Sequence, residues 1–209
     1  CETLESGAEG VDGFYIKRRQ VFRGRWIRHG GYYPKYLLKL FSRKRVYFND
    51  AELVDHHFYV TGPTRFLHHD LIEDNCKEND ITFWIQKHCR YAALMAQEEF
   101  SRRQTRGRSP NGMVRPNPFG SPDQKSLWLK NLWNRLPLYV RPWLYFFYRY
   151  VLRLGFLDGR QGLVFHFLQA CWFRFMVDTY LDDMLGNDRQ ARNQSSAVAL
   201  EAPDVTTPL

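Results

Sequence analysis

The sequence predicts a mixed α/β protein whose first part is rich in strands and whose second part is helical. Short runs of aromatic and β-branched residues, separated by glycine and proline, fill the chain up to about residue 63, which is the pattern of strands and turns. Further along, apolar residues recur at three- and four-residue spacing, as in amphipathic helices. With 209 residues, 44% hydrophobic and 16% aromatic, the chain is long enough to bury a sizeable core.

The composition limits the classes of partner and compartment. Lys and Arg number 30 against 22 Asp and Glu, and the net charge of +8 favours anionic partners such as nucleic acid, phospholipid headgroups or phosphate-bearing substrates. The four cysteines are scattered without a Cys-x-x-Cys pair, so we expect a reducing compartment rather than a disulfide framework. The chain begins at Cys1 without an apolar signal segment, and we expect it to be a piece of a longer protein.

The strands are expected in the first 63 residues, where β-branched and aromatic side chains are frequent. The predicted strands cover Gly13 to Phe22, Tyr36 to Phe41, Val46 to Phe48 and Leu53 to Val60. Glycines at positions 24, 30 and 31 mark turns, and residues 61–63 form a loop.

A long helix is expected next, capped by Asn79 or Asp80. Its apolar positions are Ile81, Trp84, Ile85, Tyr91, Ala92 and Met95. Arg102 and Arg103 suit the C-terminal end of this helix. Residues 105–126, with their prolines and glycines, are expected to form a flexible loop.

Residues 127–186 are expected to form aromatic, amphipathic helices. The stretch from Trp128 to Arg153 mixes aromatic residues with Lys and Arg too often for an ordinary transmembrane span. Its composition fits a helix lying on an anionic membrane surface, and equally a helical core packed on the strand-rich part.

A second helix is expected from about residue 161 to 185, ending at Gly186. One side of it carries Leu163, Phe167, Ala170, Cys171, Arg174, Val177, Leu181 and Met184. Residues 187–209 are expected to be a polar, disordered tail.

Three adjacent polar residues, Asp55, His56 and His57, sit in the apolar run that is predicted to be the fourth strand. A positioned carboxylate or imidazole can act as a general base. His56 and His57 point to opposite faces of a strand, so only one of them belongs to a site there. A zinc site formed by His56, His57, His68 and His69 is a weaker alternative, because these histidines lack the His-x-x-x-His spacing of a helical site. From this alternative, His57 is kept as a possible metal ligand.

Candidate binding residues lie upstream, in a turn rich in cations and aromatics. Gly30 and Gly31 allow close backbone approach of a ligand, and Tyr33 offers a flat face on which sugars pack. His29 precedes the two glycines and is included with them. A plain tight turn is the alternative interpretation.

Three cations and one carboxylate complete the candidates. Arg18, Arg19 and Lys39 suit a diphosphate or a charged acceptor, although for any single cation a solvated basic face is the simpler interpretation. Glu73 is a candidate for the rim of the site, and helix capping or solvent exposure fits it equally well.

The order of these motifs resembles the acceptor half of family 2 glycosyltransferases. The similar segments are residues 13–19, 26–34, 38–41, 54–57 and 70–74, followed by 150–159 and an aromatic helix. The resemblance extends from about Val11 to Met184. It implies a partial GT-A-like fold in residues 1–104, the C-terminal portion of a mixed sheet with flanking helices. Residues 127–186 resemble the extension of bacterial members that build lipopolysaccharide core, capsule or exopolysaccharide.

The resemblance implies an inverting transfer of a sugar from a nucleotide-sugar donor to a saccharide or lipid-linked acceptor. The protein would act in the cytoplasm, peripheral on the inner face of the plasma membrane. Members of the family bind a divalent metal, Mg or Mn, through an Asp-x-Asp triplet in the donor-binding half. This chain has no Asp-x-Asp, so we expect that half to lie outside it and this chain alone to be inactive.

The resemblance also assigns the base. Relatives often carry Glu where this chain has His56, which makes Asp55 the favoured base, with His56 as the alternative and loss of activity as the third outcome.

Two other classes of protein stay open at this point. A catalytically inactive membrane-surface protein on the same scaffold is supported by the His56 departure. A nucleic-acid-binding module would use the Arg and Tyr clusters, but no recognised nucleic-acid motif is present, and nucleic acid is the disfavoured partner.

Overall fold

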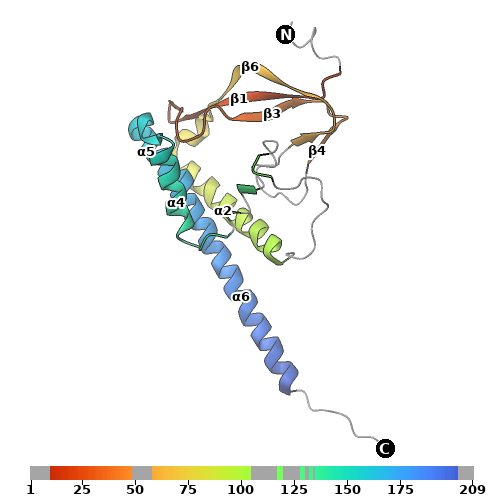
Figure 1. Cartoon of the computed structure of the whole chain (residues 1–209). Helices are drawn as coiled ribbons and strands as arrows, with labels where there is room; N and C mark the ends of the chain where they lie inside the picture. Colours follow the sequence, from red (N-terminus) through yellow and green to blue (C-terminus); the bar gives the residue numbers. More distant parts are fainter. Residues whose placement is uncertain are drawn as a thin grey trace, which may run out of the picture.

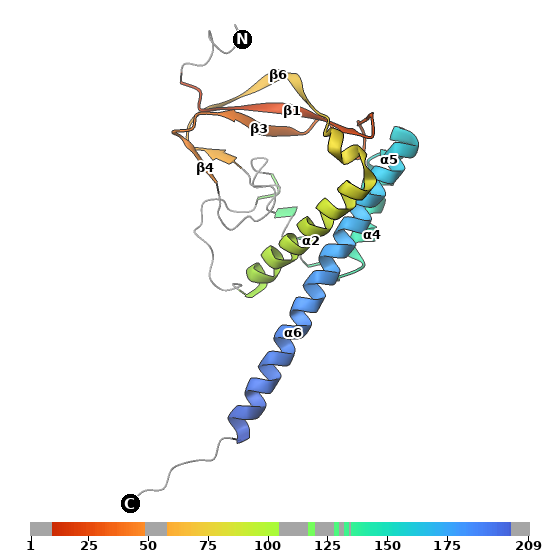
Figure 2. The same cartoon turned by 180° about the vertical axis from the view of Figure 1, so that it is seen from behind.

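Strands occupy the N-terminal part of the chain and helices the C-terminal part (Figure 1). The computed structural model describes residues 10–48, 58–104, 117–119, 128–129, 132–133 and 135–201. The main sheet forms one layer, and the helices pack against one side of it and extend away from it (Figures 1 and 2). The predicted mixed α/β class is therefore confirmed.

The main sheet is built around its longest pair of strands. The strands are β1 (Gly13–Phe22), β2 (Arg25–Ile27), β3 (Tyr36–Phe41), β4 (Val46–Phe48), β5 (Phe58–Val60) and β6 (Thr64–Glu73). β1 is central: β2 and β3 pair antiparallel with its C-terminal and N-terminal parts, and β6 pairs with it in parallel. β4 and β5 form a separate antiparallel pair. The predicted bounds of β1, β3 and β4 are confirmed.

β6 is a strand that the sequence did not predict. Its pairing with β1 is interrupted by a bulge, in which residues 67–69 stand opposite Ile16 alone. His68 and His69 lie in this bulge and are exposed. Most of β6 is exposed, so its side chains lack the buried alternation by which strands are predicted.

The two faces of the sheet differ. Successive side chains of a strand point to opposite faces. Phe22 and Ile27 are buried on the face toward the helices, in a core cluster with Trp84 and Phe165. We call this the inner face. The opposite, outer face is not covered by any described helix (Figures 1 and 2).

The helical part begins after β6. Its elements are η1 (Cys76–Asn79), α2 (Ile81–Gln104), α4 (Arg141–Phe147), η2 (Tyr148–Leu152), η3 (Gly155–Asp158), α5 (Gly159–His166), η4 (Phe167–Trp172) and α6 (Phe173–Glu201). η1 and η3 are 3-10 helices, and η2 and η4 are π-helical segments. Asp80 caps α2, because its carboxylate accepts a hydrogen bond from the Thr82 N–H at 2.8 Å. Among the described residues, no helix has the length and apolar character needed to cross a bilayer.

The predicted helix end at Gly186 is wrong, because α6 continues to Glu201. The disordered tail predicted from residue 187 is therefore wrong for residues 187–201. A single glycine costs only about 1 kcal/mol in a helix, which neighbouring residues can offset. Arg192 pairs with Asp188 one turn away at 3.0 Å, and the sequence then supplies mostly good helix formers until Pro203. Residues 202–209 lie outside the described residues.

α2 and α6 pack through small residues on one helix and large residues on the other. Ala92 and Ala96 of α2 contact Phe173, Val177 and Leu181 of α6 in a second core cluster. The burial predicted for Val177 and Leu181 is confirmed. Leu163 and Phe167 do not share that buried side: their exposed fractions are 43% and 40%.

A buried arginine ties three helices together. Arg141, at the start of α4, donates to both carboxylate oxygens of Glu99 on α2, at 3.0 and 3.1 Å. It also donates from Nε to Asp178 on α6 at 2.7 Å, and from Nη2 to the same oxygen. Burial raises the pKa of Glu99, but the hydrogen bonds and charge of Arg141 outweigh it, so the pKa lies below its ordinary value. Glu99 and Arg141 are therefore both ionised at neutral pH.

We expect Arg141→Met to lower the free energy of unfolding by about 3–5 kcal/mol, because Glu99 and Asp178 are left buried without their cation. Urea unfolding followed by circular dichroism measures this change. Arg192→Met is the matched control, since the Arg192 side chain is 70% exposed, and it should change stability by less than about 1 kcal/mol. Equal effects of the two substitutions would contradict the role given to Arg141.

Candidate functional site

The predicted binding residues lie on the sheet and on the turn between β2 and β3. Arg18 and Arg19 are on β1, and Glu73 is the last residue of β6. The turn between β2 and β3 carries His29, Gly30, Gly31 and Tyr33. The candidate bases Asp55 and His56, and the candidate ligand His57, lie outside the described residues.

Asp70 is the centre of a cluster on the outer face. Arg19 Nε lies 2.6 Å from one oxygen of its carboxylate, Tyr33 donates to the same oxygen at 3.0 Å, and Lys17 is 3.2 Å from the other oxygen. The hydrogen bond from Arg19 is the largest of the effects that lower the pKa of Asp70. Segments 17–19, 33 and 70 thus meet at one point of the sheet.

An aromatic surface adjoins Asp70. Arg19 and Arg28 lie over the ring of Trp26, with guanidinium carbons 4.5 and 5.4 Å from its centroid. Tyr33 packs edge-on against the same indole, at 5.0 Å between centroids. Trp26 Nε1 is buried and has no hydrogen-bond partner among the described residues. The outer face therefore combines cations, aromatic rings and a buried donor that no described group satisfies.

Arg18 points to the inner face, because it alternates with Lys17 and Arg19. It donates to Glu73 at 3.3 Å, so the two predicted residues are brought together. Arg18 Nε is also buried and without a partner in the described part of the chain. Lys39 is not part of either cluster: it is exposed on β3 opposite the Phe14–Tyr15 step of β1.

The turn after β2 is held by a carboxylate from the helical part. Asp158, at the end of η3, accepts hydrogen bonds from the backbone N–H groups of Arg28 and His29 at 3.1 and 2.8 Å. Its other oxygen lies 2.7 Å from Nδ1 of His29. The Asp158 side chain is 3% exposed, so these contacts are shielded from water. One side chain therefore fixes the start of the turn.

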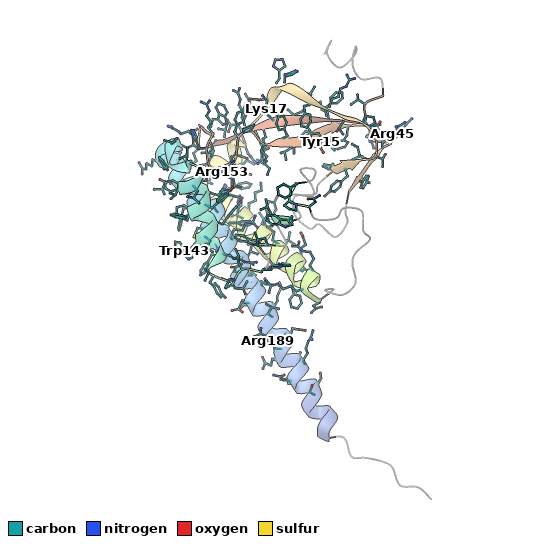
Figure 3. The ribbon with its side chains drawn as sticks, viewed as in Figure 1. Tyr15, Lys17, Arg45, Trp143, Arg153 and Arg189 are labelled. Atoms are coloured by element: carbon teal, nitrogen blue, oxygen red, sulfur yellow. The ribbon has the colours of Figure 1, made fainter. Side chains whose placement is uncertain are left out.

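Gly30 is needed for packing. The residue has φ +70°, and a Cβ placed on it would lie 2.0 Å from Cε1 of His166. Its backbone N–H donates to the carbonyl of Arg153 at 2.9 Å, and its carbonyl accepts from Arg149 at 2.5 Å. Arg153 lies where the helical part meets the sheet (Figure 3). Protein groups thus bind both polar atoms of Gly30, and His166 packs directly against its Cα.

Arg149, beside the turn, donates hydrogen bonds to a hydroxyl and a carbonyl within the described part of the chain. Arg149 stacks over Tyr32, with its guanidinium carbon 4.3 Å from the ring centroid, and donates to the hydroxyl of Tyr145. Burial raises the pKa of Tyr145, but the charges of Arg149 and Arg174 outweigh it and the net shift is downward. Arg149 and Arg174 thus place positive charge next to Tyr145, close to the turn.

Sequence reasoning did not assign roles to Asp70, Asp158, Arg149 or His166. Only Asp158 carried a usable signal, because it is the single acidic residue between Asp123 and Asp178. An isolated carboxylate in a basic and aromatic segment is a candidate for a specific buried contact.

The described residues contain no group of three or more His, Cys, Asp or Glu that could hold a metal ion. No protein-family model matches the chain, and no solved structure matches it. The described part brings cations and aromatic rings together near a turn that the helical part holds in place.

We expect Asp158→Asn to loosen the turn, because the amide has no negative charge and one acceptor oxygen, whereas the carboxylate accepts from the Arg28 and His29 N–H groups with one oxygen and contacts His29 Nδ1 with the other. Amide exchange at Arg28 and His29, followed by NMR, should become faster, and stability should fall by about 1–3 kcal/mol. Asp188→Asn, which changes a surface pair, is the control. Unchanged exchange at both amides would refute the role of Asp158.

A pH effect follows from His166, which is fully buried with both ring nitrogens lacking hydrogen-bond partners among the described residues. Burial, aided by the charge of Arg149, lowers its pKa to about 4 from an ordinary 6.5. The unfolded chain then binds this proton more readily than the folded chain, so stability falls as pH drops from 6.5 toward 4.

The expected loss in the free energy of unfolding, from pH 6.5 to pH 4, is roughly 2–3 kcal/mol. Urea unfolding at a series of pH values, compared with His166→Gln, isolates the contribution, because glutamine does not titrate. The difference between the two proteins should change only in this pH window. A constant difference would show that His166 does not titrate as stated.

Proposed function

We propose that this chain is the acceptor-side part of an inverting glycosyltransferase of the family 2 type, with a GT-A-like fold. It would contribute to the transfer of a sugar from a nucleotide-sugar donor to a saccharide or lipid-linked acceptor in bacterial surface-polysaccharide synthesis. The donor-binding half would be supplied by sequence outside this chain. On this proposal the present chain alone has no transfer activity.

One observation carries the proposal: predicted ligand contacts from distant segments converge. Arg19 and Tyr33 meet at Asp70, Arg18 meets Glu73, and the turn at residues 28–31 is fixed by Asp158. Arg18 and Glu73 come from segments 55 residues apart, and their pair on the inner face lies beside the Asp70 cluster on the outer face along the same two strands, β1 and β6. The cluster also has the chemistry that sugars and diphosphates require.

The reaction needs a base and a stabilised leaving group. A donor's diphosphate gains negative charge as the sugar bond breaks, and Arg18 and Arg149, whose charges both act on Tyr32 in the turn, would supply positive charge for it. Asp55 is proposed to remove the proton of the acceptor hydroxyl, with His56 as the alternative base.

The divalent metal that such enzymes use does not fit the described residues, which offer no cluster of ligands for it. The proposed location is the cytoplasm, at the inner face of the plasma membrane, because nucleotide sugars and lipid-linked acceptors would meet there.

The test is Asp55→Asn and, separately, His56→Gln in the full-length protein that contains this chain. Nucleoside diphosphate release from a panel of nucleotide sugars measures transfer with and without acceptor. If Asp55 is the base, Asp55→Asn lowers the transfer rate by about 10²- to 10⁴-fold while thermal unfolding is unchanged. A larger fall in His56→Gln would move the role to His56.

Asp188→Asn serves as the control, since that carboxylate lies on α6 and belongs to neither cluster. Full transfer activity in both test variants would sink the proposed chemistry.

A further inference from the structure

Exposed apolar side chains gather along one side of α4 and η2. They recur every three or four residues, so they lie above one another on the same side of the helical segment. These residues are Trp143, Leu144, Phe147, Tyr148, Val151 and Leu152. We call this the α4 surface. Figure 3 shows Trp143 on the outer side of the helical part, away from the sheet.

The exposure is not caused by loose packing of the segment. Arg141 and Pro142 of α4 are buried, and Arg149 is fixed by its bonds to Gly30 and Tyr145. The segment is thus attached firmly by one side while the other side presents large apolar groups. Trp143 is 54% exposed and Leu152 is 62% exposed. An apolar surface of this extent on a well-packed segment indicates a binding partner.

The exposed charged side chains nearest to the α4 surface along the chain are cations, while Asp182 of α6 accepts a hydrogen bond from Tyr139 before the start of α4. Among the described residues from 135 to 177, the exposed charged side chains are Arg135, Arg153 and Arg160. The single acidic residue there, Asp158, is 3% exposed. Arg25 adds a further cation, close to Gly159 at the start of α5. A partner that carries negative charge over a wide area complements this surface.

We propose that the α4 surface docks onto the headgroup region of an anionic phospholipid bilayer. Trp and Tyr side chains are suited to the interface between water and hydrocarbon, and the leucine and phenylalanine side chains can enter the acyl region. The arginines then meet lipid phosphates. The segment from Arg141 to Leu152 is roughly 18 Å long, and it lies in the plane of the interface instead of crossing it.

This inference goes beyond the proposed transfer reaction, because it rests on exposed side chains outside the candidate site. Vesicle binding without transfer leaves it standing. Transfer without vesicle binding overturns it, together with the proposed membrane location, and leaves the proposed transfer reaction intact.

The test is co-sedimentation of the whole chain with vesicles of phosphatidylcholine, with and without phosphatidylglycerol. We expect binding that requires phosphatidylglycerol and weakens as salt is added. Trp143→Ser and Leu152→Ser should each weaken binding about tenfold, because each removes a large apolar group that the bilayer would bury. Arg153→Gln and Arg160→Gln should each weaken it about fivefold.

The matched control is Phe66→Ser with Ile72→Ser on β6, whose side chains are 57% and 64% exposed but lie on the sheet. This control should bind vesicles as the unchanged chain does. Hydrogen exchange of the unchanged chain, with and without vesicles, should show protection limited to residues 141–157, and this readout needs no variant to fold.

Three results would overturn the proposal. The chain fails to bind anionic vesicles; the control loses as much binding as Trp143→Ser; or gel filtration shows a dimer that Trp143→Ser dissociates, in which case a second copy covers the surface.

Discussion

The Asp158 carboxylate joins the strand-rich and helical parts of this protein, and the candidate site depends on that contact. β2 has only three residues, so most of the turn between β2 and β3 has no ladder pairing to fix it. Asp158 supplies the missing constraint by accepting the N–H groups of Arg28 and His29 from a position 129 or 130 residues further along the chain. Arg149 and Arg153 bind the next residue, Gly30, through its carbonyl and its N–H. The position of the turn is therefore set by the helices.

Two kinds of charge cluster serve different purposes in the structure. Inside the helical part, Arg141 is balanced by Glu99 and Asp178, and such a network fixes the relative positions of α2, α4 and α6 more than it adds net stability. Near the turn, positive charge is in excess. Asp70 forms ion pairs with both Lys17 and Arg19. Arg149 donates hydrogen bonds to a carbonyl and a hydroxyl. An excess cation held by neutral partners keeps its charge available to an incoming anion.

Local composition was sufficient for three of the strands. β1, β3 and β4 were predictable because aromatic and β-branched runs end at turn residues. β6 was not, since its exposed side chains and its bulge at residues 67–69 disturb the alternation. The candidate site was predicted only in part. Arg18, Arg19 and Tyr33 could be selected by residue type, whereas Asp70 and Asp158 act through partners distant in sequence, which no local pattern records.

The segment from Arg141 to Asp158 performs two tasks because a helix separates its sides. Arg141, Tyr145 and Arg149 are spaced four residues apart, so they share one side, where they bind Asp178, the guanidinium of Arg149 and the carbonyl of Gly30 respectively. Trp143 and Phe147 have the same spacing on the exposed side. A substitution of Trp143 or Phe147 leaves the contacts of the other side in place. A substitution of Arg141 or Arg149 moves the turn and the exposed side together. The backbone of this segment thus fixes the orientation of the turn relative to the partner that covers the α4 surface.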